Sequence, residues 1–366
     1  MPDPRAAAPS PPAGPLSPPA PVIMEPTVEA VHPLTPLQEG MLLHAGLAPE
    51  AGVDLVQYVL ALRGPVDPAA LRDAWEAVLR RHPALRTGFA WTDGAGRASV
   101  HRHVPLAWAE DDWRTLPAAE QDARLEGHLR ADRARGFDPA RPPLLRLMLV
   151  RAGHDAWRLV WTHHHLLLDG WSAPLVLGEV LAAYRAALRG AVADLPARRP
   201  FADYAAWLRG RDPARTEAFW RAELAGRGAP TPLPAPASGG GEDVEEGEDE
   251  GVAEASLEAV PTAELRALGR RLGVTLGTLA RGAWALLLAG WSGEEDVLFG
   301  GVVSGRPAEL EGAGEMVGMF VNTVAVRVRV DPGATVAGWL AGLQARAAAA
   351  REHEHAPVAE VRRWSG

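Results

Sequence analysis

Residues 162–172 read THHHLLLDGWS and place adjacent histidines four residues before an Asp-Gly pair. The preceding run RLVW at 158–161 is typical of a strand, and apolar residues recur at helical spacing after Ser172, a favourable N-cap residue. A neutral imidazole takes up and returns a proton near neutral pH. The pattern therefore predicts a strand, a tight loop and a helix, with a histidine facing open space and Asp169 turned inward to fix the loop.

The composition excludes several kinds of chemistry. The 366 residues are enough for two domains, they include no Cys, and all 37 basic residues are Arg. Disulfides, thiol nucleophiles and lysine chemistry are thus absent. The net charge of −9 becomes −2 without the acidic run 242–250. The rest of the chain is therefore nearly neutral and lacks the basic charge expected of a nucleic-acid-binding domain. The apolar stretch 276–291 contains Arg281 and is too short to predict a membrane span.

The distribution of Pro, Gly and charge predicts two lobes. Residues 1–27 are rich in Pro and Ala and are predicted to be a disordered linker. Residues 28–197 form the first lobe, which carries the histidine motif. Residues 198–366 form the second lobe, with a disordered acidic insertion near 235–251.

Strands and helices are expected in both lobes. The predicted strands are 55–62, 100–104, 144–150, 157–161, 253–257, 297–304 and 323–330. The predicted helices begin after Pro36 and at Asp67 and include 121–135, 262–272, 275–290 and 336–353.

The motif His164-His165-x-x-x-Asp169-Gly170 resembles the HHxxxDG signature of condensation domains from nonribosomal peptide synthetases. Its shorter HxxxD core is shared with the wider acyltransferase superfamily that includes chloramphenicol acetyltransferase. Other segments resemble further motifs of the condensation family in the same order along the chain. These segments are 33–41, 81–89, 201–207, 317–323 and 353–364.

The resemblance implies an α/β (α+β) fold of two chloramphenicol acetyltransferase-like lobes. The lobes are expected to form a V-shaped pseudo-dimer with a tunnel between them. Family members continue beyond the point at which this chain stops, so the C-terminal lobe is expected to be incomplete. The activity of this fragment by itself is in question for that reason.

The reaction implied by the resemblance is amide formation between two carrier-bound substrates. The α-amino group of the acceptor attacks the thioester carbonyl of the donor. We assign His165 to the amine, either as general base or as a group that positions it. His164 points the other way on an extended backbone and is assigned a structural role. Asp169 is expected to hold the loop through a salt bridge to Arg86, with Arg81 as the second choice.

The remaining candidates support the site or line the tunnel. Gly170 is expected to let the backbone approach the substrate or adopt a positive φ, and its N–H could face the oxyanion. Trp171 and Ser172 are expected to support the loop. Asn322 either makes a structural hydrogen bond or lines the tunnel, and Ser304 is a second tunnel candidate.

Alternative functions are an epimerisation domain, an ester-forming domain and a non-catalytic recruitment domain of the same family. The segment VGMFVNT at 317–323 favours condensation over epimerisation. No cofactor and no metal is expected, since His163 and His165 share a face without a third ligand at a recognisable spacing. Expected partners are donor and acceptor carrier domains with phosphopantetheine arms and a neighbouring adenylation domain, without nucleic acid or membrane. The expected location is the cytoplasm.

Overall fold

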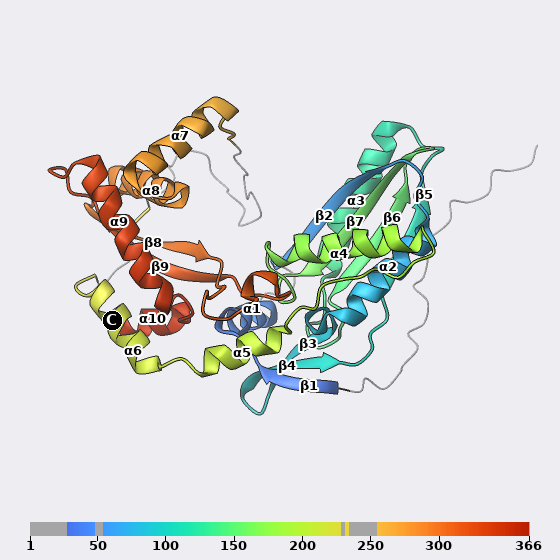
Figure 1. Cartoon of the computed structure of the whole chain (residues 1–366), viewed down its shortest axis with the longest axis horizontal. Helices are drawn as coiled ribbons and strands as arrows, with labels where there is room; N and C mark the ends of the chain where they lie inside the picture. The colour runs from blue at the N-terminus through green and yellow to red at the C-terminus, as the bar shows by residue number, and fades with distance from the viewer. Residues whose placement is uncertain (1–27, 48–53, 228–230, 234–254, 366) are drawn as a thin grey trace, which may run out of the picture.

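Two groups of elements make up the computed structural model, which describes residues 28–47, 54–227, 231–233 and 255–365. Figure 1 shows the N-terminal group on the right, the C-terminal group on the left, and α1 and α5 between them. The predicted linker 1–27 and the acidic insertion near 235–251 lie outside the described residues. The pseudo-dimeric relation of the two groups stays a prediction.

The N-terminal group is built on a four-stranded sheet with the order β2-β7-β6-β5, and a three-stranded sheet with the order β1-β4-β3 lies beside it. In the larger sheet β7 pairs antiparallel with both neighbours, whereas β5 and β6 are parallel. The elements are β1 (Val28–Pro33), α1 (Pro36–Leu47), β2 (Leu55–Arg63), α2 (Pro68–Arg81), the 3-10 turn η1 (Pro83–Arg86), β3 (Thr87–Thr92), β4 (Ala95–His101), β5 (Ala107–Asp112), α3 (Ala118–Arg135), β6 (Leu145–Arg151), β7 (Ala156–His164) and α4 (Ser172–Ala187).

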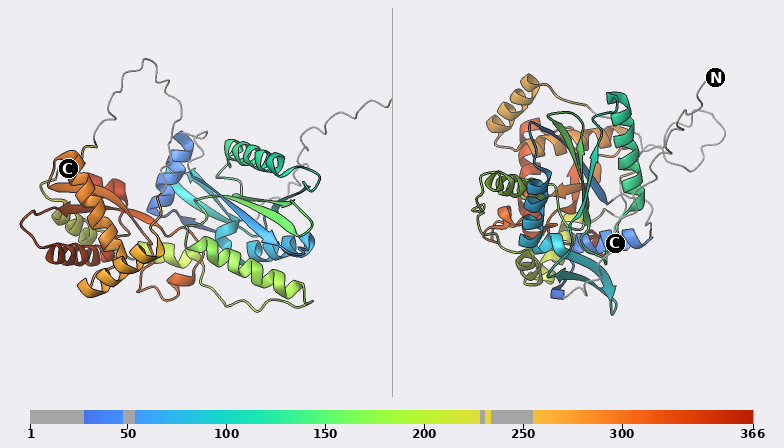
Figure 2. Two further views of the ribbon diagram at one scale, coloured as in Figure 1. Left: turned by 90° about the horizontal axis from the view of Figure 1, so that it is seen from above. Right: turned by 90° about the vertical axis from the view of Figure 1, so that its right-hand side faces the viewer.

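The main hydrophobic core lies between this sheet and the helices α2 and α4. Figure 2 shows α3 on the opposite side of the sheet. Trp75 of α2 meets Trp161 of β7 edge to face, with ring centroids 5.0 Å apart, and both side chains are fully buried. Asp67 caps α2 and Pro68 occupies its first position, which starts the helix beneath the sheet. The core thereby fixes the end of β7, where the histidines begin.

The C-terminal group contains one antiparallel pair, β8 and β9, and a set of helices around it. Its elements are α5 (Phe201–Arg209), α6 (Pro213–Leu224), α7 (Ala259–Leu272), α8 (Leu276–Ser292), β8 (Asp296–Val303), η2 (Ala313–Glu315), β9 (Asn322–Arg329), α9 (Val336–Ala350), η3 (Arg351–His353) and α10 (Val358–Ser365). No single helix in the described part of the chain is long and apolar enough to cross a membrane. The pair α7 and α8 passes that test together, with a bend of 100°.

Several predicted elements differ from the structure. The strand predicted at 100–104 lies earlier, at Ala95–His101, and the strands β1 and β5 were not predicted. The described part of the strand predicted at 253–257 has no regular structure. Helix α4 begins at Ser172, so the N-cap position belongs to Trp171 and the prediction of a Ser172 cap is wrong.

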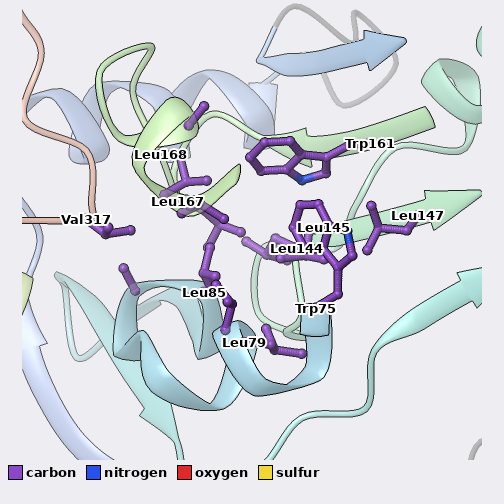
Figure 3. Close-up of a cluster of buried hydrophobic side chains, with 14 of the residues drawn as sticks. Trp75, Leu79, Leu85, Leu144, Leu145, Leu147, Trp161, Leu167, Leu168 and Val317 are labelled. Carbon is purple, nitrogen blue, oxygen red and sulfur yellow. The ribbon is translucent and has the colours of Figure 1, made fainter. Parts of the chain in front are cut away.

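The connection between β8 and β9, residues 304–321, joins the two groups. It inserts Val317 into the main core of the N-terminal group, where Figure 3 shows this side chain near Leu85, Leu167 and Leu168. Gly318 follows, and a Cβ atom at this position would overlap the ring of Phe201. We call residues 304–321 the crossing segment. Its close packing makes the core of one group depend on the other.

We predict that Gly318→Ala lowers the free energy of unfolding by about 1–3 kcal/mol, because the added methyl group must displace Phe201. Urea unfolding followed by tryptophan fluorescence measures the change. Gly314→Ala is the matched control, since a Cβ at Gly314 has no atom within 4 Å. Equal stability of the two variants would show that the crossing segment is not tightly packed against Phe201.

Candidate active site

The histidine motif lies where β7 leaves the sheet. His164 is paired with Leu55 of β2, and its N–H donates to the carbonyl of Leu144 at 2.9 Å. The N–H of His165 donates to the carbonyl of Asp54 at 2.7 Å. Backbone hydrogen bonds to Leu144 and Asp54 therefore hold the two histidines at the end of the strand. This arrangement fits the predicted strand followed by a tight loop.

The three histidines differ in how their side chains are used. His163 is buried, contacts Trp161 in a tilted geometry and stacks on Tyr58, with ring centroids 4.9 and 5.9 Å away. Burial, with the neighbouring imidazoles of His165 and His164, lowers the pKa of His163 to about 3. This ring is an uncharged part of the aromatic core.

His164 is also buried and has a structural hydrogen bond. Its Nδ1 accepts the N–H of Leu166 at 3.1 Å, which places the proton of the neutral ring on Nε2. Burial lowers the pKa of His164 to about 4, and the carboxylate of Asp54 opposes this effect. The geometry supports the structural role proposed for His164.

His165 is the only one of these three side chains that is not fully buried. Its Nδ1 is buried and has no hydrogen-bond partner within the described residues, so a substrate can meet only the exposed part of the ring. An imidazole at the end of a rigid strand that is not committed to such an internal bond can accept a proton or a hydrogen bond from a substrate. Of the three histidines, His165 is therefore the one available for chemistry.

Asp169 is the anchor of the loop. Its carboxylate is fully buried and accepts two hydrogen bonds from the guanidinium of Arg306, at 3.1 and 3.2 Å. It also accepts the N–H of Ser172 at 2.7 Å and the N–H of Phe320 at 3.1 Å. One side chain thus binds the first N–H group of α4 and ties the loop to the crossing segment.

The partner predicted for Asp169 was wrong. Arg86 is buried elsewhere, where it pairs with Glu29 at 3.0 Å and donates to the carbonyl of His101. Arg81 pairs with Glu179 of α4 at 3.0 Å. The true partner, Arg306, comes from the other group of elements. Sequence reasoning missed it because the chain has only arginine as a basic residue, so one arginine in a loop carries no distinguishing signal.

Ser172 and the crossing segment are joined by three further hydrogen bonds. The Oγ of Ser172 donates to the carbonyl of Gly318 at 2.8 Å and accepts the N–H of Gly318 at 3.1 Å. It also accepts a hydrogen bond from Arg306 at 2.8 Å. The hydroxyl therefore supports the loop as expected, although it does so across the junction and not as a helix cap.

Two other predicted residues lie at the edge of the loop. Trp171 is about half exposed, and its indole N–H donates to the carbonyl of Gly314 at 2.9 Å. Gly170 is exposed and does not adopt a positive φ, so that part of the prediction is wrong. A Cβ at Gly170 would meet no atom within 4 Å, which leaves room for a substrate beside the backbone.

The two tunnel candidates have different environments. The amide of Asn322 is buried and donates to the carbonyls of Glu354 and Ala356 at 2.7 and 2.9 Å, which favours its structural role. Ser304 is exposed and lines a cavity of about 530 Å³ in the C-terminal group, together with Arg306. This cavity reaches the motif through Arg306, and His165 is not part of its lining.

Comparisons with known proteins identify the family and the fold of this chain. The family model for the condensation domain matches residues 28–365. One of the proteins that make up the linear gramicidin synthase of Brevibacillus parabrevis is 41% identical over 344 residues, which are 93% of this chain and 4% of that protein. Another protein of the same synthase is 42% identical over 341 residues, which are 92% of this chain and 6% of that protein. The chain therefore spans only a small part of these relatives.

Among solved structures, the first condensation domain of the calcium-dependent antibiotic synthetase has the same fold. It matches with a TM-score of 0.74 and 21% identity, over 93% of this chain and 79% of that chain. A holo four-domain nonribosomal peptide synthetase matches with a TM-score of 0.73 and 21% identity, over 93% of this chain and 25% of that chain.

We predict that Asp169→Ala lowers the free energy of unfolding by about 3–5 kcal/mol, because it leaves the buried guanidinium of Arg306 without its counter-charge. Urea unfolding measures the loss. Glu76→Gln, which breaks the exposed pair with Arg72, is the control and should change stability by less than about 1 kcal/mol. An Asp169→Ala protein with normal stability would contradict the anchoring role.

A second prediction concerns the pH dependence of stability. Unfolded His163 binds a proton below its ordinary pKa of 6.5, whereas the folded ring stays neutral down to about pH 3. Its contribution to stability is thus present above pH 6.5 and is lost, at up to about 1.4 kcal/mol per pH unit, as the pH falls through this window. His163→Phe should therefore flatten the pH dependence of the unfolding free energy between pH 6 and pH 4.

Urea titrations at several pH values measure this slope. His154→Gln alters an exposed histidine in the turn between β6 and β7 and serves as the control. A His163→Phe protein whose stability falls as steeply with acid as that of the parent would show that His163 is not held neutral in the fold.

Proposed function

This chain belongs to the condensation domain family of nonribosomal peptide synthetases, and we propose that it joins two carrier-bound substrates through an amide bond. The donor is an acyl or peptidyl thioester on an upstream carrier domain. The acceptor is the amine of an aminoacyl group on a downstream carrier domain. Both substrates are held on phosphopantetheine arms, and the domain supplies no cofactor of its own.

The proposed step balances without another reactant. The amine nitrogen of the acceptor attacks the thioester carbonyl carbon, and the carbon–sulfur bond breaks as the tetrahedral adduct collapses. His165 accepts a hydrogen bond from the amine and then takes the proton that the nitrogen sheds. The proton passes on to the departing thiolate, so the products are an amide and a free thiol.

One observation carries this proposal. His165 is the one motif histidine that is partly exposed, and its loop is held by the buried pair of Asp169 and Arg306. Such an arrangement supports a role of His165 in positioning the acceptor amine, because a side chain on a rigid loop is held at a fixed distance from the bound substrate. Gly170 supports the access of substrate, since its Cα faces open space.

The partners follow from the reaction. We propose donor and acceptor carrier domains and a neighbouring adenylation domain, in a cytoplasmic synthetase. The curated relatives are synthases many times longer than this chain, which supports a setting of this kind. Amide formation is preferred to epimerisation because the segment 317–323 lacks the aromatic pattern expected of the epimerisation class.

The test uses the chain with an acyl-loaded donor carrier and an aminoacyl-loaded acceptor carrier. We predict that His165→Ala reduces single-turnover amide formation by about 10²-fold or more, because general base catalysis contributes on that order. Mass spectrometry of the acceptor carrier measures the product.

His154→Ala is the matched control, because this histidine is exposed in a distant turn. It should form product at the rate of the parent chain. Replacing the acceptor amine with a hydroxyl separates amide from ester formation. Product formed at the same rate by His165→Ala and by the parent would disprove the proposed role of His165.

A further inference from the structure

A buried glutamine connects the segment 33–41 to the histidine loop. Gln38 lies in the first turn of α1, the helix that Figure 1 shows between the two groups of elements, and it is 2% exposed. Its amide Nε2 donates to the carbonyl of Leu166 at 3.0 Å, across 128 positions of the chain. Leu166 directly follows His165. This hydrogen bond therefore acts on the backbone next to the histidine that we assign to the amine.

The other half of the same amide serves the start of α1. The Oε1 of Gln38 accepts the N–H of Thr35 at 3.1 Å, and the Oγ1 of Thr35 accepts the N–H of Gln38 at 3.4 Å. This reciprocal pair is a capping box, in which the third residue of the helix reaches back to the residue before it. Thr35 is also buried. The capping box thus fixes the direction in which the Nε2 of Gln38 points.

The capping box alone does not explain why this residue is a glutamine. A glutamate at the same position would accept the N–H of Thr35 equally well, and its negative charge would favour the first turn of the helix. Only the amide of glutamine can accept this N–H and at the same time donate to the carbonyl of Leu166. The choice of residue is therefore explained by the bond to the histidine loop.

The backbone that follows His164 is held at three successive peptide groups. The N–H of His165 donates to the carbonyl of Asp54 at 2.7 Å, and the N–H of Leu166 donates to the Nδ1 of His164 at 3.1 Å. Gln38 holds the third peptide group through the carbonyl of Leu166. A buried carbonyl that loses its donor is costly, so this contact restrains the loop strongly.

We infer that Gln38 is a positioning residue for His165. It is buried and acts through the backbone of the loop, which keeps the imidazole at a fixed place relative to the acceptor amine. Its effect on amide formation rests on the proposed function, whereas its hold on the loop does not.

The first test is hydrogen exchange, measured by NMR. The N–H groups of His165 and Leu166 are compared with that of Trp161 in the middle of β7, so that a change in overall stability cancels. We expect Gln38→Leu to accelerate the relative exchange of both loop groups about tenfold, the effect of one lost hydrogen bond.

Gln121→Leu is the matched control. This glutamine of α3 is also buried, and its amide donates to three backbone carbonyls, those of Trp113, Leu116 and Ala152. These carbonyls lie at the end of β6 away from the histidines, because Arg151 pairs with Trp157 and Leu145 pairs with His163. The control should leave the relative exchange of the loop unchanged.

The second test is single-turnover amide formation with loaded carriers. Gln38→Leu should lower the rate at saturating carrier about tenfold and leave the carrier concentration for half the maximal rate unchanged, because the base is misplaced while the carriers still bind. Gln121→Leu should keep the rate of the parent chain. Circular dichroism checks that each variant is folded.

Gln38→Glu separates the cap from the loop contact. The introduced carboxyl group keeps the capping box, but in its ionised form it has no proton to donate to Leu166. We expect the ratio of its rate to that of the parent to be about one tenth at about pH 9. The ratio should rise as the pH falls, because the protonated carboxyl group donates again and burial raises the pKa of such a group.

Unchanged relative exchange of His165 and Leu166 in Gln38→Leu would overturn the inference. Parent-like rates in both Gln38 variants across this pH range would overturn it as well. A parent chain that forms no amide would contradict the proposed function alone, because the exchange experiment measures no turnover.

Discussion

The buried ion pair between Asp169 and Arg306 is the interaction on which the site depends. It joins two residues 137 positions apart and crosses from the N-terminal group to the crossing segment. Removing two charges from water is expensive, and further hydrogen bonds offset part of this cost. Asp169 also accepts the N–H groups of Ser172 and Phe320, and Arg306 donates to the carbonyls of Ala313 and Met316. The Nε of Arg306 is buried without a hydrogen-bond partner among the described residues. The same network places the start of α4 and the end of the histidine loop. His165 therefore takes its position from contacts made by both groups of elements.

The hydrophobic core and the polar network enforce the same arrangement. Val317 packs into the core of the N-terminal group, and its neighbour Gly318 exchanges two hydrogen bonds with Ser172. A shift of the crossing segment would break apolar packing and leave buried polar groups unpaired at once. This coupling gives a physical reason for a loop that is both rigid and open on one side at Gly170. Arg306 also lines the cavity of about 530 Å³ in the C-terminal group, so the ion pair borders that space.

The local parts of this arrangement were predictable from sequence, and the long-range parts were not. The strand, loop and helix around the motif follow from a run of apolar residues and from helical spacing, which are local signals. Strands β1 and β5 were missed because both lie at sheet edges, where half-exposed sequences such as AWAEDD lack an apolar run. The partner of Asp169 was misassigned because an ion pair between the N-terminal group and the crossing segment has no signature in the sequence around either residue. Asn322 could serve two roles by type, and its contacts with Glu354 and Ala356 favour the structural one.

The most direct test of this anchoring role is a double-mutant cycle between Asp169 and Arg306. The variants Asp169→Asn, Arg306→Gln and the double variant are compared with the parent by urea unfolding. If the pair anchors the loop, the loss in the double variant is smaller than the sum of the single losses by about 1–3 kcal/mol, since each single change already removes the interaction. Additive losses would show that the two charges act independently and that the histidine loop is held in some other way.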